Sequence, residues 1–249
     1  MNAPSNALSV SIQAKRFANG TCAIGNLHFQ ARPGEFVAIV GPSGAGKTTL
    51  LKIISGLDTA FDGQVQLAPD THVGFMFQEP RLMPWLTVAQ NLALVSKTLT
   101  GAALTSALEQ VGLKGCADLF PGQLSGGMQR RVALLRAFSV APQLLLMDEP
   151  FQSLDAPNAE QLRAHLLALW QSSKPTVLFV THNLSEALAL ADRVLFLTPG
   201  PSTIALELPV DLPRPRAQHS AAVQGLRSDL LARYPDLLKG SAAESHTAT

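Results

Sequence analysis

The glycine-rich run at residues 41–48 constrains the fold of this 249-residue chain more than any other feature. It reads Gly-Pro-Ser-Gly-Ala-Gly-Lys-Thr and follows an apolar run, residues 35–40, that predicts a buried strand. Residues 48–55 predict a helix. Glycines let consecutive backbone amides converge on phosphate oxygens, and a helix N-terminus favours negative charge. The order strand, glycine-rich loop, helix therefore predicts a P-loop that holds a nucleoside triphosphate.

The last two residues of this run have separate chemical roles in the prediction. Lys47 is placed to reach the β- and γ-phosphates, and the Thr48 hydroxyl is suited to bind Mg²⁺. The remaining loop residues contribute mainly backbone amides. The residues expected to contact the nucleotide are Gly41, Pro42, Ser43, Gly44, Ala45, Gly46, Lys47, Thr48 and Thr49.

Two carboxylates end a second apolar run, residues 144–149. Asp148 is a natural partner for Mg²⁺, and Glu149 is a natural general base for the attacking water. The alternative is a solvated strand end, which Pro150 would close as an ordinary breaker. The presence of Lys47 in a P-loop favours the metal and base roles.

A histidine follows a third apolar run. Residues 176–181 predict a buried strand, and His182 comes directly after them. Ligands of open α/β sheets bind at the carboxyl ends of the strands. A lone histidine is often structural, but this position in a chain with a P-loop favours a catalytic role.

Residues 124–129 read Leu-Ser-Gly-Gly-Met-Gln, and with the motifs above they make the chain resemble the ATP-binding cassette (ABC) ATPases over residues 8 to about 212. The resemblance implies ATP and Mg²⁺ as ligands. It places Gln78 in the Q-loop, where it would bind Mg²⁺ and act on the attacking water, and makes His182 the switch histidine. Phe17 falls where the family stacks an aromatic ring on adenine, although a core aromatic is an equal reading. The implied motifs are Walker A at 41–48, Walker B ending in Asp148 and Glu149, and the D-loop at 153–155.

The residues 124–129 also predict a second anion site. Ser125 is a good N-cap, Gly126 and Gly127 expose amides, and residues 128–138 predict a helix. The resemblance implies that this signature closes over the nucleotide of a second subunit in a head-to-tail homodimer. The residues implied in that contact are Ser125, Gly126, Gly127, Gln129 and Asp155.

The fold class implied is α/β, with a P-loop NTPase (RecA-like) core sheet flanked by helices, an N-terminal antiparallel β-subdomain and a helical ABC-specific subdomain. We expect the ATPase domain at residues 1–212, with the helical subdomain at about 81–138, and a C-terminal extension at 213–249. Further local expectations are antiparallel strands at 8–14 and 27–31, a turn at 62–63 before a strand at 64–67, a strand at 73–77, helices at 87–97, 100–111 and 220–238, a strand at 192–197, and disorder at 240–249.

Composition excludes several classes of protein. The net charge of +1, with 15% charged residues, gives no field that argues for nucleic acid. Cys22 and Cys116 lack metal-ligand spacing and are expected to be buried reduced thiols. The chain has no apolar run of the roughly 18 residues that a membrane helix needs, and no signal-peptide pattern.

The similarity extends to one group of transporters. Residues 79–124 are too few for the long coiled coil of chromosome-maintenance ATPases. Residues 84–91, 148–151, 186–193 and 212–216 resemble the ATPases of bacterial importers for nitrate, sulfonates and taurine. The chain departs from that group at Gln152 and Ser153, which replace a small pair, and at Asn183, which replaces an aspartate.

This resemblance implies an integral membrane permease and a second copy of the chain as partners, and indirectly a solute-binding protein. The chain would lie at the cytoplasmic face of the inner membrane, with residues 78–85 in the groove that receives a permease helix. An exporter or lipid-transport ATPase, a soluble ABC ATPase outside transport, and a regulatory cassette without turnover remain as alternatives.

Overall fold

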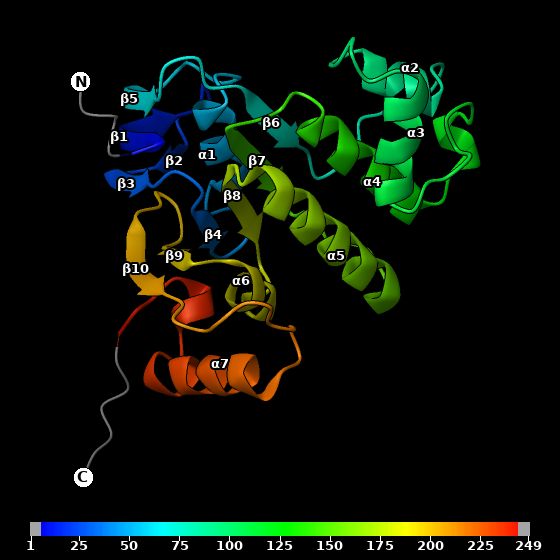
Figure 1. The fold of residues 1–249 in the computed structure, drawn as a ribbon. Coiled ribbons are helices and arrows are strands. Elements are labelled where there is room, and N and C mark those ends of the chain that lie inside the picture. The colour runs from blue at the N-terminus through cyan, green and yellow to red at the C-terminus, as the bar shows by residue number, and fades with distance from the viewer. Residues whose placement is uncertain (1–5, 244–249) are drawn as a thin grey trace, which may run out of the picture. The chain divides into compact units, whose positions relative to one another are not determined.

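The computed structural model describes residues 6–243, and the chain divides into two compact units. Unit 1 comprises residues 1–69 and 176–249, and unit 2 comprises residues 70–175. Figure 1 shows the elements of both units with their labels.

An antiparallel sheet in unit 1 is built around β1 (Leu8–Arg16). β1 pairs with β2 (Cys22–Ile24), β3 (Leu27–Ala31) and β5 (Asp62–Leu67). Val10 lies opposite Phe29 on one side and Val65 on the other. Leu8, Val10 and Ile12 are buried while the intervening serines are half-buried. The antiparallel strands expected at residues 8–14 and 27–31 are therefore confirmed.

The second sheet of unit 1 has the strand order β10-β9-β4-β8. β4 (Phe36–Val40) pairs in parallel with β8 (Thr176–Thr181) on one side and β9 (Arg193–Leu197) on the other. β10 (Ile204–Pro209) adds an antiparallel edge. Every residue of β4 and β8 is buried, which explains their continuous apolar sequences. α1 (Lys47–Ile54) follows β4.

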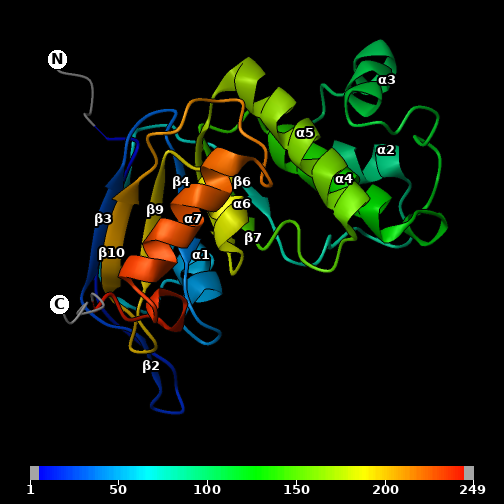
Figure 2. The same ribbon diagram turned by 90° about the horizontal axis from the view of Figure 1, so that it is seen from below.

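Two helices of unit 1 follow β8. α6 (Leu184–Leu190) connects β8 to β9, and α7 (Ala221–Arg233) packs on α6, as Figures 1 and 2 show. α7 begins at the N-cap Ser220, whose hydroxyl accepts a bond from Val223 N. The helix expected at 220–238 ends early because Tyr234 precedes Pro235, and a residue before proline is disfavoured in a helix. A short 3-10 helix, Leu237–Lys239, follows.

Unit 2 contains the parallel strands β6 (Val73–Met76) and β7 (Leu144–Asp148) and the helices between and after them. These are α2 (Val88–Ala93), α3 (Gly101–Gln110), α4 (Gly126–Phe138) and α5 (Ala156–Ser173), with a 3-10 turn at Pro121–Gln123. α4 packs on α2, on α5 and on β6. The apolar cluster inside the helical part consists of Val88, Leu92, Leu108, Val111, Leu113, Cys116, Leu124, Val132 and Leu135.

Three local expectations were wrong. Asp62 and Gly63 lie in β5 rather than in a turn, and a Cβ on Gly63 would be 2.1 Å from Ser11 O of β1. The helix after Thr87 ends at Ala93 instead of residue 97. In the loop that follows, the Ser96 and Thr98 hydroxyls share a 3.3 Å hydrogen bond, and such local side-chain bonds compete with helix formation. Cys22 is half-buried rather than buried, and its thiol donates to Ile24 O.

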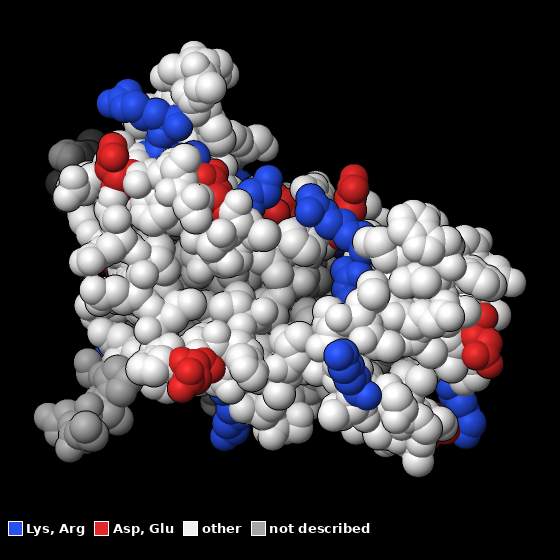
Figure 3. Space-filling model, turned by 90° about the horizontal axis from the view of Figure 1, so that it is seen from above, with Lys and Arg blue, Asp and Glu red and all other residues white. Residues whose placement is uncertain are grey.

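Charge and hydropathy on the structure agree with the composition. Basic and acidic side chains are interspersed on the face that Figure 3 shows, and most of that face is uncharged. Across residues 6–243, none of the helices combines the length and apolar character that spanning a bilayer requires. The tail expected to be disordered falls mostly on residues 244–249, outside the described residues.

Candidate nucleotide-binding site

The loop between β4 and α1 has the backbone that the glycine pattern predicts. Gly44 and Gly46 have φ angles of 81° and 70°, in the left-handed region that disfavours side chains. A Cβ on Gly46 would lie 3.2 Å from Ala23 O and from the Ile24 side chain. Gly46 is also the N-cap of α1, so the backbone amides of the first helical turn adjoin the loop. This arrangement is suited to an anion at the loop.

Lys47 is the charged side chain of this loop. It is 8% exposed, and its Nζ donates to the carbonyl oxygens of Gly41 at 2.8 Å and Pro42 at 2.9 Å. Thr48 and Thr49 are half-buried in the first turn of α1. The ammonium is therefore held against the loop backbone, where the P-loop geometry requires a cation for phosphates.

His182 leaves the sheet at the same edge as this loop. Val40 and Thr181 are opposite each other in the register of β4 and β8, so Gly41 and His182 both follow the carboxyl ends of neighbouring strands. His182 is exposed. Asn183 caps α6 by accepting from Ser185 N at 3.0 Å and Glu186 N at 3.3 Å. Because asparagine and aspartate cap equally well, the departure at Asn183 preserves the start of α6.

Phe17 lies in the turn between β1 and β2, where its amide donates to Thr21 O at 2.9 Å. Its side chain is 41% exposed. Lys15 Nζ lies 5.1 Å from the ring centroid and pairs with Asp58 at 2.7 Å. The hydrogen bond from Lys15 holds the pKa of Asp58 below its usual value. At this exposure the Phe17 ring is not part of the buried core.

In unit 2, β6 and β7 end at a second edge. The register pairs Met76 with Met147, so Gln78 and the carboxylates Asp148 and Glu149 leave the strands close in register. Asp148 is 3% exposed, whereas Glu149 is half-buried beyond the strand end. Glu149 has a φ of 46°, a conformation that costs a non-glycine residue about 1–3 kcal/mol. A strained backbone thus sets the direction of this carboxylate.

The signature residues form the start of α4, as expected. Ser125 Oγ accepts from Met128 N at 3.2 Å, and Ser125 and Gly126 are exposed. Gly127 is buried, and a Cβ at this position would lie 2.8 Å from Asn158 Oδ1. Gln129 Nε2 donates to Pro121 O at 3.0 Å, so this side chain ties down the preceding loop. Asp155 caps α5 through Asn158 N at 2.9 Å.

Two arginines of α4 that the sequence analysis did not single out contact these loops. Arg130 donates to Pro150 O at 3.2 Å, and Arg136 donates to Pro80 O at 2.7 Å and Arg81 O at 2.8 Å. Burial lowers the pKa of both guanidinium groups from the usual value. The sequence signal that could have indicated these contacts is the presence of arginines in a helix that has an apolar face.

The predicted residues therefore gather in three places. The P-loop and His182 share one edge in unit 1, Gln78, Asp148 and Glu149 share one edge in unit 2, and the signature residues begin α4. Among residues 6–243, no three histidine, cysteine, aspartate or glutamate side chains form a metal cluster. Each unit offers side-chain oxygens of the type that Mg²⁺ prefers, on Thr48 in unit 1 and on Gln78 and Asp148 in unit 2.

The comparisons with known proteins agree with this geometry. The family model described as "ABC transporter" matches residues 24–152. The chain is 46% identical over 218 residues to an aliphatic sulfonates import ATP-binding protein of Pseudomonas fluorescens, which covers 87% of this chain and 82% of that one. It is 38% identical over 239 residues to the protein of that description from Bacillus licheniformis, covering 91% and 94%.

Solved structures show the same fold. One is a dimeric post-hydrolysis state of the ATP-binding cassette MJ0796 bound to ADP and Pi, with a TM-score of 0.70, 29% identity, and coverage of 83% of this chain and 100% of that chain. The chain belongs to the ABC transporter family of ATP-binding proteins. It is an ATP-binding ATPase with the α/β cassette fold.

Proposed function

We propose that this ATPase powers a membrane importer for aliphatic sulfonates or similar small anionic solutes. The carrying observation is the similarity to two sulfonates import ATP-binding proteins, at 38% and 46% identity over most of the chain. The sequence resemblance at residues 84–91 and 212–216, which lie outside the nucleotide motifs, supports the same class of importer. No observation favours an exporter, a lipid transporter or a soluble ABC ATPase.

The site residues have separate proposed roles. The amides of residues 41–49 and the Lys47 ammonium bind the phosphates of ATP, and Phe17 stacks on adenine. Thr48, Gln78 and Asp148 hold Mg²⁺, which neutralises charge on the phosphates. Glu149 accepts the proton of the attacking water, while Gln78 and His182 orient that water and the γ-phosphate.

The signature residues act on the nucleotide of a second copy of the chain. Ser125, Gly126, Gly127, Gln129 and Asp155 are proposed to close over that γ-phosphate in a head-to-tail homodimer. The exposed residues Ser125 and Gly126 at the start of α4 support this, since a helix N-terminus favours an anion and the chain already has a P-loop. The dimeric neighbour bound to ADP and Pi also supports it.

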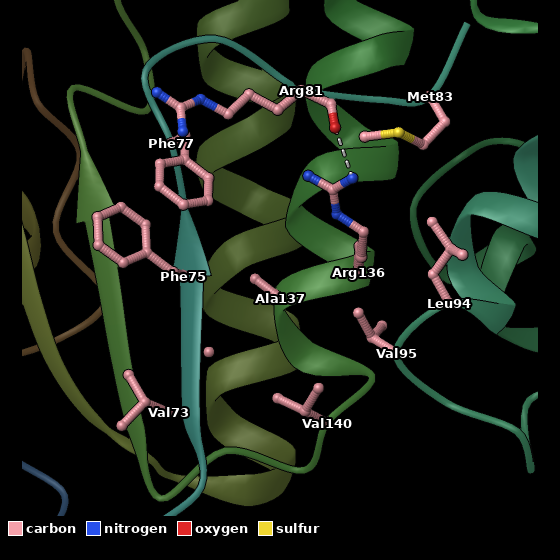
Figure 4. A pocket seen from close by; sticks show the side chains of 11 residues that line it. Val73, Phe75, Phe77, Arg81, Met83, Leu94, Val95, Arg136, Ala137 and Val140 are labelled. Carbon is pink, nitrogen blue, oxygen red and sulfur yellow. Dashed lines mark hydrogen bonds between the residues drawn. The ribbon is translucent and has the colours of Figure 1, made fainter. Parts of the chain in front are cut away.

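A groove in unit 2 is the proposed docking site for a cytoplasmic helix of the permease. It has a volume of about 390 Å³ and lies beside the segment that follows Gln78 (Figure 4). Leu94, which lines the groove, is 58% exposed, and Trp85, two residues after Met83 of the lining, is 70% exposed. Such exposure is unusual for large apolar side chains. Leu82, in contrast, packs on the helical core. The groove is lined by Val73, Gly74, Phe75, Phe77, Arg81, Met83, Leu94, Val95, Arg136, Ala137 and Val140.

An apolar permease helix with an acidic or carbonyl-rich end fits this groove best. The Arg81 guanidinium lies 4.1 Å from the centroid of the Phe77 ring, so the groove offers a cation above an aromatic wall (Figure 4). Through this permease the chain would be peripheral at the cytoplasmic face of the inner membrane. A solute-binding protein would act with the permease on the other side.

Uptake of an aliphatic sulfonate by cells that lack the chain tests this function. We expect wild type to restore uptake and growth on that sulfonate as the only sulfur source, and Lys47→Ala to restore neither. Growth on sulfate is the control, and it should not depend on the chain. Normal sulfonate uptake without the chain would refute the proposed solute class.

A further inference from the structure

Gln78 is hydrogen-bonded to a residue that the sequence analysis noted only as a departure from related importers. Gln78 Nε2 donates to Gln152 Oε1. The resemblance to the importer ATPases implies a small residue at position 152, and a small side chain could not form this bond.

The orientation of an amide matters for the role proposed for Gln78. Only the Oε1 end of a glutamine binds a cation or accepts a hydrogen bond from water, whereas the Nε2 end only donates. The bond to Gln152 occupies the Nε2 end. A Gln78 amide turned by 180° would present its donor to the metal, and it would keep a bond to Gln152 only if the Gln152 amide turned with it.

The backbone under Gln152 is held in a fixed turn. Gln152 N donates to Glu149 O at 3.1 Å. Glu149 and Ser153 on either side have φ angles of 46° and 62°, and such conformations persist only where the surroundings hold them. Arg130 of α4, which is 9% exposed, supports this turn through Pro150 O.

The backbone after Gln78 is held by the same helix. Arg136 of α4 binds the carbonyl oxygens of Pro80 and Arg81 with its two terminal nitrogens, and Figure 4 shows the bond to Arg81. Both partners of the glutamine pair therefore stand on segments attached to α4. Two side chains on fixed segments lose little further freedom when they pair.

We propose that Gln152 is a positioning residue that orients the Gln78 carboxamide with its oxygen toward Mg²⁺ and the attacking water. This inference rests on the role of Gln78 in the proposed function. Without Gln152, Gln78 would have to be ordered at each turnover, which slows hydrolysis and leaves ATP binding by the P-loop intact.

Steady-state ATP hydrolysis by the full-length protein tests the proposal with kcat and KM measured at saturating Mg²⁺. Gln152→Met keeps the length of the side chain and removes the acceptor, so kcat should fall about three- to tenfold with little change in KM. Gln152→Glu keeps an acceptor, so its kcat should fall by less. Gln171→Met, on the exposed side of α5, is the matched control and should match wild type.

A double-mutant cycle with Gln78→Ala separates the proposal from general damage. In the Gln78→Ala background, Gln152→Met should have no further effect on kcat. Thermal unfolding of each variant reports on folding. If Gln152→Met lowered kcat only by destabilising the protein, the same fall in kcat would be seen in the Gln78→Ala background, so the cycle separates the two causes.

The outcomes distinguish this inference from the function on which it rests. If Gln78→Ala leaves kcat unchanged, the role of Gln78 is wrong and the proposal falls with it. If Gln78→Ala lowers kcat but Gln152→Met leaves it unchanged, raises it, or lowers it equally in both backgrounds, Gln152 is not a positioning residue and the role of Gln78 stands.

Discussion

At the scale of one residue, Glu149 combines a strained backbone conformation with a proposed catalytic role. It lies directly after the buried Asp148, and its φ of 46° turns its side chain out of the alternation of β7. The apolar run at residues 144–149 predicts a strand that includes Glu149, since nothing in its sequence indicates a left-handed residue. The left-handed conformation therefore falls on Glu149, the residue that we propose as the general base.

Glu149→Gln should abolish turnover and leave ATP binding intact. An amide cannot accept the proton of the attacking water, and loss of a general base typically costs about 10²–10⁴ in rate. Phosphate release and equilibrium binding of a fluorescent ATP analogue measure the two effects. Because uncleaved ATP would persist in the site, the variant should also dimerise more strongly with ATP than wild type. Near-normal hydrolysis would remove Glu149 from the mechanism.

At the scale of elements, the C-terminal extension holds the end of α6. The strap at residues 212–216 carries Arg216, which donates to Ala189 O at 3.0 Å, Leu212 O at 2.7 Å and Val210 O at 3.3 Å, and also to Ala191 O. Arg214 donates to Leu190 O and pairs with Asp192 at 2.7 Å. Cations at a helix C-terminus satisfy its last carbonyl groups.

Arg216→Met should lower the free energy of unfolding by about 2 kcal/mol. It removes charged donors and leaves carbonyl groups at the end of α6 without these partners. Chemical denaturation of the full chain measures the change. Arg227→Met, half-buried on α7, is the control and should stay within about 0.5 kcal/mol of wild type. Equal stability of the two variants would show that the strap contributes nothing to α6.

Arg81→Glu combined with Trp85→Ala should abolish copurification with the permease and solute uptake. The change reverses the charge above Phe77 and removes a side chain that is 70% exposed, and such residues often contribute about 2 kcal/mol or more to an interface. Circular dichroism should show a folded subunit, and Arg227→Glu is the charge-reversal control. A double variant that assembles and transports normally would place the docking site elsewhere.

The elements predicted from sequence are those with strong local signals. β4, β8 and α1 follow from apolar runs and a glycine-rich loop, and Thr87 caps α2 with a reciprocal bond to Gln90. β10 and α5 were not predicted, since the residues of β10 are half-buried or exposed and α5 has few buried positions. Gly63 was read as a turn because its close approach to β1 depends on tertiary pairing.

Sequence motifs predicted the residues of the candidate site, but they did not predict the hydrogen bonds that support these residues. The P-loop, Asp148 and His182 each follow a buried strand, so their places can be read locally. The bonds from Arg130 and Arg136 to Pro150, Pro80 and Arg81 join segments 20 to 56 residues apart, which no local pattern reveals. The Gln78–Gln152 bond spans 74 residues in the same way.

At the scale of the whole molecule, the proposed homodimer pairs each of the two anion sites with a second copy of the chain. The P-loop begins α1 in unit 1, and the signature begins α4 in unit 2. If each signature acts on the nucleotide of the other copy, a defect in the signature of one chain and a defect in the P-loop of the other should fall on the same nucleotide. The second nucleotide would then have an intact site.

Hydrolysis by mixed dimers tests this account most directly. Ser125→Arg alone should leave the ATP affinity of the subunit nearly unchanged and suppress hydrolysis, and Lys47→Ala alone should suppress both. Mixing the two variants should restore part of the wild-type rate of phosphate release, because one of the two sites in each mixed dimer lacks neither group. Restored activity is the result that the account predicts. If mixed dimers form, as differently tagged chains would show, and no activity returns, the account of two independent shared sites is wrong.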